Sequence, residues 1–183
     1  MSDTLSPAQR HYTMSQIRSS NTKPEVRLRH ILWSQGFRYR VNDKRLPGKP
    51  DIVLPKYHSV IFVHGCFWHG HGGCRKYSIP KTNTEFWINK VKRNQERDQE
   101  DWRKLEAKGW HVIIVWECEL EKSRYQGTIH RVVADIVENR AQYLQRQKER
   151  NEERIRRKME LSEKKAVIQS HLDELFQVSW AKK

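Results

Sequence analysis

Residues 50–74, PDIVLPKYHSVIFVHGCFWHGHGGC, contain two short β-rich runs followed by a glycine-rich loop. Asp51–Leu54 and Ser59–Val63 are rich in Val, Ile and Leu, and so short a connection between two runs is typical of antiparallel neighbours. The eleven residues from His64 onward combine three histidines, two cysteines, two large aromatics and four glycines. We therefore expect a hairpin-like pair of strands in a mixed sheet, ending in a loop that carries the chemistry.

The charge balance of the chain favours a polyanionic partner. The 183 residues include 36 Lys and Arg but only 22 Asp and Glu, which gives a formal net charge of +14. Nucleic acid is the first candidate, and a merely soluble basic protein is the alternative. No run of 18 apolar residues occurs, and the N-terminus lacks the apolar core of a secretory signal. We expect a cytoplasmic, nucleoid-associated protein with no membrane partner.

Three parts follow one another along the chain. Residues 1–20 have no sustained apolar period and are interpreted as an N-terminal arm. Residues 21–142 hold the apolar periodic segments of one domain. Residues 143–183 are a charged extension, predicted to be helical, in which Arg, Lys, Glu and Gln dominate the first half. This extension is either a solvated helix or a basic arm along nucleic acid.

The helices are predicted from caps and breakers. Thr22 through Glu25 combines an N-cap Thr, an early Pro and a Glu three residues later, which predicts a capping box and a helix ending at Gly36. A long polar helix is expected from Thr84 to about Lys108, and another from Gly127 to Tyr143.

Two further strands complete the expected sheet. Phe37–Val41 alternates as a short strand, and the nearly continuous apolar run His111–Trp116 predicts a central strand covered on both faces. The fold class is therefore α/β, with a mixed central β-sheet flanked by helices.

The cysteines indicate a structural zinc site. Cys66, His71 and Cys74 lie within nine residues, and Cys118 follows directly after the apolar run that ends at Trp116. Three thiolates and one imidazole make a complete tetrahedral set for Zn²⁺, with no position left for a catalytic water. The alternative is three unrelated buried thiols.

A second group of residues fits a magnesium-dependent nuclease. Pro-Asp at the start of one strand, followed on the next by an acid, a spacer and a Lys, is a nuclease pattern. Here Phe62 and His64 stand in place of the acid and the Lys, so Asp51 alone supplies a carboxylate, helped by the Val63 backbone carbonyl and by waters. Such a site suits Mg²⁺. Alternatively, Asp51 is a plain turn residue.

The remaining histidines are candidates for acid–base chemistry. His69 is placed to act as a general base on water, and His64 to contact the scissile phosphate or carry a proton. An imidazole hydrogen-bonded into a loop is the equally open alternative for each.

Three aromatic residues fit a DNA wedge. Phe67 and Trp68 lie in the glycine-rich loop, and Trp87 lies at the start of the polar helix. An apolar side chain inserted between base pairs unstacks them, most easily at a mismatch. Core packing is the alternative for each ring.

Several blocks in order resemble the very short patch repair (Vsr) mismatch endonucleases. The resemblance runs from about Ser15 to Leu120 and is carried by IRSSNTKPE, GFRYRVND, LPGKPDIVLP, VIFVHGCFWHGHGGC, TNTEFW, NQERD and GWHVIIVWECEL. It implies a restriction-endonuclease-like core and Mg²⁺-dependent nicking immediately 5′ of the thymine in a T:G mismatch. Such mismatches arise by deamination of 5-methylcytosine, and the nick initiates very short patch repair.

The resemblance also implies roles for individual residues. Asp51 is similar to the family's Mg²⁺-binding carboxylate, His69 to its catalytic histidine and His64 to its auxiliary histidine. Asp98 is similar to the carboxylate paired with the catalytic histidine, and Glu25 to the acid that reaches the metal through water. The three aromatics match the intercalating residues, and the cysteines with His71 match the structural zinc ligands.

The family implies a DNA-gripping arm at residues 1–20 and a monomer that works on duplex DNA with a methyltransferase and a mismatch-repair matchmaker protein. This sequence departs from the family in two places. Val63 stands where some members have Thr, and the extension from residue 143 matches no part of the family pattern. Two other functions stay open: a zinc-stabilised DNA-binding module without catalysis, and a nuclease for a different mismatch or lesion.

Overall fold

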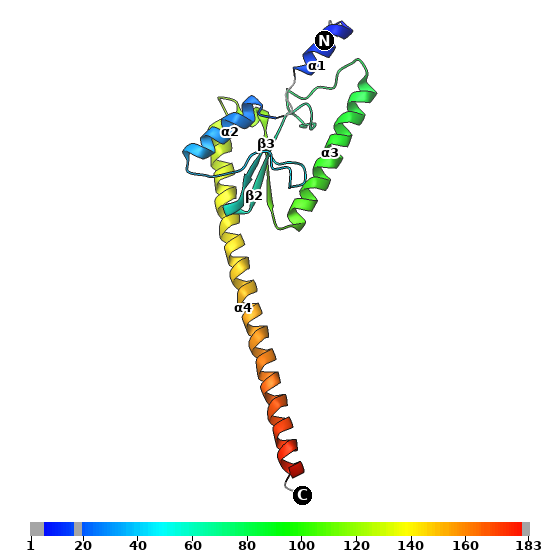
Figure 1. Ribbon diagram of the computed structural model, residues 1–183. Coiled ribbons are helices and arrows are strands. Elements are labelled where there is room, and N and C mark those ends of the chain that lie inside the picture. Colours follow the sequence, from blue (N-terminus) through cyan, green and yellow to red (C-terminus); the bar gives the residue numbers. More distant parts are fainter. Residues whose placement is uncertain (1–5, 17–19, 181–183) are drawn as a thin grey trace. The chain divides into compact units, whose positions relative to one another are not determined.

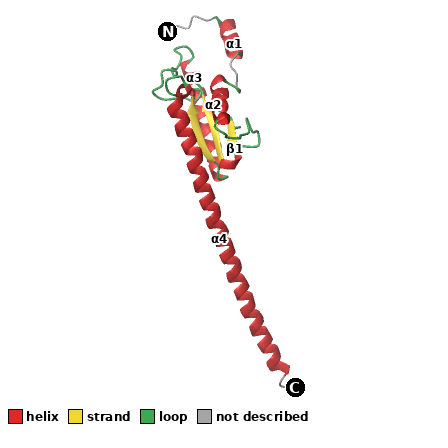
Figure 2. Ribbon diagram, turned by 90° about the vertical axis from the view of Figure 1, so that its left-hand side faces the viewer, coloured by secondary structure: helices red, strands yellow, loops and turns green. Residues whose placement is uncertain are grey.

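The computed structural model describes residues 6–16 and 20–180, shown in Figures 1 and 2. The chain divides into two units, residues 1–140 and residues 141–183. No helix among the described residues is long and apolar enough to span a bilayer. The elements in chain order are α1 (Pro7–Ser15), α2 (Lys23–Ser34), β1 (Ile52–Leu54), η1 (Pro55–Tyr57), β2 (Ser59–His64), α3 (Thr84–Ala107), β3 (His111–Trp116), η2 (Glu117–Leu120) and α4 (Tyr125–Trp180).

The sheet has the order β1-β2-β3 and is mixed, as predicted. β1 runs antiparallel to β2, with Ile52 opposite Ile61, and β2 runs parallel to β3, with Ser59 opposite His111. The prediction that 111–116 is the central strand is wrong, because β2 lies between the other two. A continuous apolar run indicates that both faces of a strand are covered by other elements. It does not indicate whether the strand has a neighbouring strand at each of its two edges.

Two apolar layers hold helices against the two faces of the sheet. Alternate strand residues point to opposite sides, so Ile52 and Ile61 face α2 and α4 whereas Val53 and Val60 face α3. Figure 1 shows α2 and the first part of α4 on one side of the strands and α3 on the other. Each buried Leu, Ile or Val side chain stabilises the fold by roughly 1.5–3 kcal/mol.

The predicted strand Phe37–Val41 is not formed. Only Arg40 pairs with the sheet, in an isolated antiparallel bridge to Val53. Asn42 adopts a left-handed conformation (φ 48°), which turns the chain away from β1 directly after the bridge. Apolar and basic residues alternate in this segment because Phe37 is buried while Arg38 and Arg40 are exposed to solvent. The alternation does not come from regular hydrogen bonding to a neighbouring strand.

The start of α2 was placed correctly, but its cap differs from the predicted one. Thr22 is the N-cap residue and its hydroxyl accepts no backbone hydrogen bond. The Thr22 hydroxyl instead donates to Glu25 Oε1 at 2.7 Å, and Glu25 Oε2 accepts from the Asn21 N–H at 2.8 Å. Glu25 is buried, so its carboxylate needs hydrogen-bond donors from the protein, and Thr22 and Asn21 supply two of them. In a capping box the Thr hydroxyl would instead accept from a backbone N–H.

The long helices extend differently from the prediction. α3 matches the expected range closely and ends before Gly109, whose φ of +80° requires glycine. α4 has 56 residues, so the helix predicted for 127–143 and the charged extension are one continuous helix. Within the predicted arm, Ser6 and Gln9 form a capping box that opens α1. Residues 1–5 and 17–19 of that arm, and residues 181–183, lie outside the described residues.

Candidate active site and metal centre

His64, His69 and Asp98 form one compact group, named here the histidine cluster. The two imidazole rings are stacked, with centroids 3.7 Å apart and planes 18° from parallel. His69 Nδ1 is hydrogen-bonded to Asp98 Oδ2. The structure thus brings Asp98 of α3 against His64 at the end of β2 and His69 in the loop that follows, about thirty residues earlier in the chain.

The charges within this cluster are set by its surroundings. Burial, and secondarily His69, lowers the pKa of His64 to about 3, so this ring is neutral at physiological pH. Burial opposes ionisation of Asp98, yet the hydrogen bond and the charge of His69 outweigh it and lower the pKa of Asp98. An ionised Asp98 accepts only, so Nδ1 of His69 carries a proton and Nε2 is the free base position.

One stripe of α3 positions the glycine-rich loop that follows β2. Asn94 Nδ2 donates to the Trp68 carbonyl at 2.8 Å, and Gln95 Nε2 donates to the His69 carbonyl at 3.1 Å. Two turns further along, the Trp102 ring stacks on His64, with ring centroids 5.7 Å apart. Prediction missed these three residues, although Asn94 and Asp98 share the buried stripe of α3 with Val91 and Leu105, an unusual place for polar side chains.

Gly70 lets the loop approach this helix. It has a φ of +67°, and a Cβ there would lie 2.5 Å from Gln95 Nε2 and 2.8 Å from Val91 Cγ1. Any other residue would be strained by the positive φ and would force the Gln95 and Val91 side chains or the loop to shift.

Asp51 lies at the entrance to β1, outside the histidine cluster. Its Oδ2 accepts a hydrogen bond from the Val63 N–H at 2.7 Å. Burial raises the pKa of Asp51 to about 6, the Val63 hydrogen bond lowers it and the charge of Glu25 raises it further. A partly desolvated carboxylate near a second carboxylate is an environment that a bound cation stabilises.

Arg29 links Asp51 to Glu25, a connection that the sequence did not reveal. Its Nη2 atom donates to Glu25 Oε2 at 3.0 Å and to the Asp51 backbone carbonyl at 3.1 Å. Glu25 thus has three donors within the protein and is held rigidly near Asp51. Glu25 therefore accepts hydrogen bonds from Asn21 and Thr22 at the start of α2 and at the same time lies near Asp51.

Four soft ligands form the second group, named here the cysteine cluster: Cys66, His71, Cys74 and Cys118. Their ligand atoms lie within 4.8 Å of one another and could hold a metal ion. His71 Nδ1 lies 3.4 Å from both Cys66 Sγ and Cys118 Sγ. Tetrahedral Zn²⁺ with ordinary bond lengths requires a sulfur–nitrogen separation of about 3.5 Å, and these two separations agree with that value.

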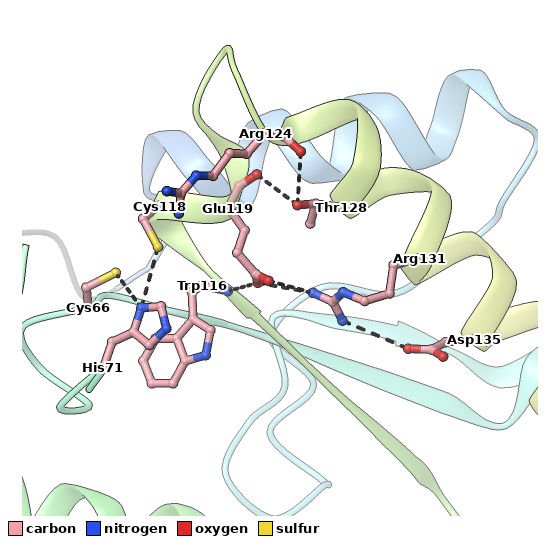
Figure 3. Close-up of polar contacts among 9 residues, drawn as sticks. All are labelled: Cys66, His71, Trp116, Cys118, Glu119, Arg124, Thr128, Arg131 and Asp135. Atoms are coloured by element: carbon pink, nitrogen blue, oxygen red, sulfur yellow. Dashed lines mark hydrogen bonds and ion pairs between the residues drawn. The ribbon is translucent and has the colours of Figure 1, made fainter. Parts of the chain in front are cut away.

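Neighbouring residues fix this cluster in place (Figure 3). The indole of Trp116 stacks on the His71 ring, with centroids 4.1 Å apart and planes 4° from parallel. Glu119 accepts from the Trp116 N–H at 2.8 Å and from Arg131 Nη2 at 3.1 Å, which ties the cysteine-bearing η2 to α4. Burial raises the pKa of the Cys66 and Cys118 thiols, so their ligand thiolates need a nearby cation.

The predicted wedge residues lie together in an aromatic cluster with one additional member. Phe67 contacts Trp68 and Trp87 with ring centroids 5.1 Å and 5.3 Å apart. Phe86, which was not predicted to take part, contacts Trp87 at 5.2 Å and is 59% exposed. The other three rings are half-buried against each other rather than in either core layer.

Comparison with known proteins gives a consistent picture. Residues 2–76 match the sequence family described as DNA mismatch endonuclease Vsr. The type II nicking enzyme V.NmeAIP of Neisseria meningitidis serogroup A is 51% identical over 137 residues, which cover 74% of this chain and 97% of that protein. The DNA mismatch endonuclease Vsr of Escherichia coli K12 is 47% identical over 120 residues, covering 66% of this chain and 76% of that protein.

The type II nicking enzyme V.XorIIP of Xanthomonas oryzae pv. oryzae is 52% identical over 120 residues, covering 66% of this chain and 88% of that enzyme. The relatives are thus matched over most of their length, and the matches leave a quarter to a third of this chain uncovered.

Proposed function

The chain belongs to the Vsr family of DNA endonucleases, and from that premise we propose that it nicks one strand immediately 5′ of the thymine in T:G mismatches. Such mismatches arise when 5-methylcytosine is deaminated, and the nick initiates very short patch repair. The mixed sheet with helices on both faces supports a restriction-endonuclease-like core.

The observation that carries the proposal is the His69–Asp98 pair. With Nδ1 bound to an ionised Asp98, Nε2 of His69 takes a proton from the attacking water, and Asp98 stabilises the imidazolium that forms. The neutral ring of His64 stacks on His69, fixes its orientation and is available as a hydrogen-bond donor to the phosphate.

Mg²⁺ is the cofactor that the Asp51 site fits best. The residues that would hold it are Asp51 and Val63, because the N–H and C=O of one strand residue point to the same side and the Val63 N–H points to Asp51. Glu25 would add negative charge beside that ion. When bound, Mg²⁺ neutralises charge on the phosphate and orients the water.

Zinc in the cysteine cluster has a structural role in this proposal. All four positions of a tetrahedral ion are filled by Cys66, His71, Cys74 and Cys118, so no water can be activated there. The cluster joins the loop after β2 to η2 and thereby holds His69 at a fixed place.

The aromatic cluster supplies the preference for a mismatch. Phe67, Trp68 and Trp87 offer adjacent ring faces, and inserting them between base pairs requires unstacking that is easiest at a mispair. The substrate is therefore duplex DNA, on which we propose that a monomer acts, with a mismatch-repair matchmaker protein as a further partner.

A strand-resolved nicking assay tests this function. Two labelled duplexes differ only in T:G against T:A, and each is incubated with Mg²⁺ and without added divalent ion. We expect a Mg²⁺-dependent nick just 5′ of the mispaired T. Folded, zinc-loaded protein that binds both duplexes and cuts neither in several sequence contexts would refute the nuclease function and favour a binding module.

A further inference from the structure

The helical region beyond Arg140 has no counterpart in a family member that is otherwise matched almost completely. The V.NmeAIP match accounts for 97% of that protein but only 74% of this chain. The family match begins at residue 2, so most of the unmatched residues fall in the second unit, 141–183. A function of this region must therefore be read from its own side chains.

Basic residues of this region gather on one face of α4. At 3.6 residues per turn, Arg146, Arg150, Arg154, Arg157 and Lys158 fall within a sector of about 120°. Lys164 and Lys165 continue the same sector one and a half turns later. All seven side chains are exposed, and we name this surface the basic face.

Acidic residues occupy a neighbouring sector of the same helix. This sector spans about 100°, does not overlap the basic face, and contains Glu149, Glu152, Glu153, Glu160 and Glu163. At the boundary between the sectors, Glu153 forms an ion pair with Arg157 of the basic face. Between residues 144 and 172, only Lys148 and Arg156 are basic residues outside the basic face. Solubility alone would be met by acidic and basic side chains mixed around the helix. Here the basic face contains no acidic residue between residues 144 and 172, so solubility does not account for its charge.

Apolar residues form two short groups instead of one continuous seam. Leu144, Ile155 and Met159 fall within about 60° of one another on one side of the helix. Leu161, Ile168 and Leu172 fall within about 40°, on the side of the basic face. A coiled coil along the whole segment needs one apolar seam at every third and fourth residue, and neither group runs through residues 144–172. Two copies would also bring two positively charged chains together. The charges, not the apolar residues, define the binding surface.

We infer that the basic face of α4 binds the phosphate backbone of duplex DNA. From Arg146 to Lys165 the face is about 28 Å long, the length of roughly eight base pairs of B-form DNA. The inference rests on the proposed action of the chain on DNA and adds a contact that is independent of the mismatch. Since phosphates carry no sequence information, this contact strengthens binding to matched and mismatched duplexes alike.

Two double variants of the full-length chain test the inference. R150Q/R154Q removes two charges from the basic face, and K148Q/R156Q removes two charges from the same helix outside that face. Gln is a good helix former, so both variants keep the helix, which circular dichroism verifies. Kd is measured for a matched duplex over a series of salt concentrations, with the wild type alongside.

We expect R150Q/R154Q to reduce the slope of log Kd against log salt by up to about 1.8, and to raise Kd by up to roughly 60-fold near 0.1 M salt. K148Q/R156Q should change both values far less. Equal effects in the two variants would show that only net charge matters and would overturn the inference. A wild-type slope and Kd in R150Q/R154Q would overturn it as well.

Two further readouts separate the alternatives. Sedimentation that shows a wild-type dimer dissociated by R150Q/R154Q, at unchanged DNA affinity, would assign the face to a second copy of the chain and refute DNA binding. The control K148Q/R156Q should nick the T:G duplex at the wild-type rate, and a large loss of nicking in this control would show that the effects are not specific to the basic face. A wild type that shows the expected salt slopes but nicks no T:G duplex refutes the proposed function and leaves this inference standing.

Discussion

The cysteine cluster and the histidine cluster draw on the same eleven-residue loop, yet they are built for different chemistry. The first gathers three thiols and an imidazole around one point, with Trp116 stacked on His71. The second stacks two imidazoles and ties one of them to a carboxylate on α3. Soft ligands that fill every position make a closed site, whereas a paired base with one free nitrogen makes a reactive one.

The comparison teaches how one loop can serve both purposes. Residues 64 and 69 meet α3, and residues 66 and 71 meet η2, so successive parts of the loop are fixed from two directions. We propose that a metal held in the cysteine cluster limits the motion of His69, which lies in the same loop. Variants that affect one cluster and spare the other therefore test the account most sharply.

Cys118→Ser should have the largest effect on the folded protein. Structural zinc contributes an apparent binding free energy of roughly 10–16 kcal/mol, so losing one of four ligands should lower Tm by about 10 °C or more. Differential scanning calorimetry and zinc content measure the change. Retention of both Tm and one equivalent of zinc would remove Cys118 from the ligand set.

His69→Ala should act on the other cluster alone. Loss of a general base lowers the nicking rate by about 10²- to 10⁴-fold. Zinc content, Tm within a few degrees and affinity for the T:G duplex should stay close to wild type. Single-turnover nicking at the normal rate would show that another group activates the water.

Asp51→Asn should abolish nicking and stabilise the Mg²⁺-free protein. The pKa of Asp51 is raised from 3.8 to about 6, so its ionised form opposes folding. The penalty is absent below pH 4, develops between about pH 4 and 6 and reaches at most about 3 kcal/mol above that range. Urea unfolding of variant and wild type side by side, at pH 4 and again at pH 7, measures the difference between them. Because both proteins carry the same cysteine cluster, any release of zinc in acid affects both alike.

Asn keeps an acceptor for the Val63 N–H, so the variant isolates the charge. Added Mg²⁺ should stabilise the wild type and leave Asp51→Asn unchanged, because only the carboxylate holds the ion. Equal stabilisation of both proteins would place the magnesium site elsewhere.

Trp68→Ala should have the smallest effect of this series. Each stacked base is worth roughly 1–3 kcal/mol, so affinity for the T:G duplex should fall by about tenfold or more and affinity for the T:A duplex by less. Competition binding of the two duplexes gives the ratio directly. Phe86→Ala is the matched comparison at the exposed edge of the aromatic cluster. Equal losses on both duplexes for Trp68→Ala would argue against a wedge.

Sequence patterns located the local features of the fold well. The β1–β2 pair and the bounds of α3 follow from β-branched runs, caps and breakers, which act over a few residues. Sequence patterns failed where contacts between segments distant in the sequence decide the structure. β3 lies at one side of the sheet although its composition is that of a central strand, and Phe37–Val41 forms only one bridge.

The candidate site shows the same division. The residues of both clusters could be named from spacing and family resemblance, and the structure brings each set together, while their roles stay predictions. Asn94, Gln95 and Arg29 were missed because their partners are backbone carbonyls and carboxylates distant in the sequence or hidden by the fold. A polar side chain on a buried helical stripe is the one signal that pointed to Asn94.

The most direct test measures zinc content and single-turnover nicking in the same three proteins: wild type, His69→Ala and Cys118→Ser. It asks whether the cysteine cluster has the structural role and the histidine cluster the catalytic one. We expect one zinc per chain in wild type and His69→Ala, with nicking at the full rate only in wild type, and loss of zinc together with a lowered Tm in Cys118→Ser. Loss of zinc in His69→Ala, or full nicking by a zinc-free chain, would contradict the assignment of structure to one cluster and chemistry to the other.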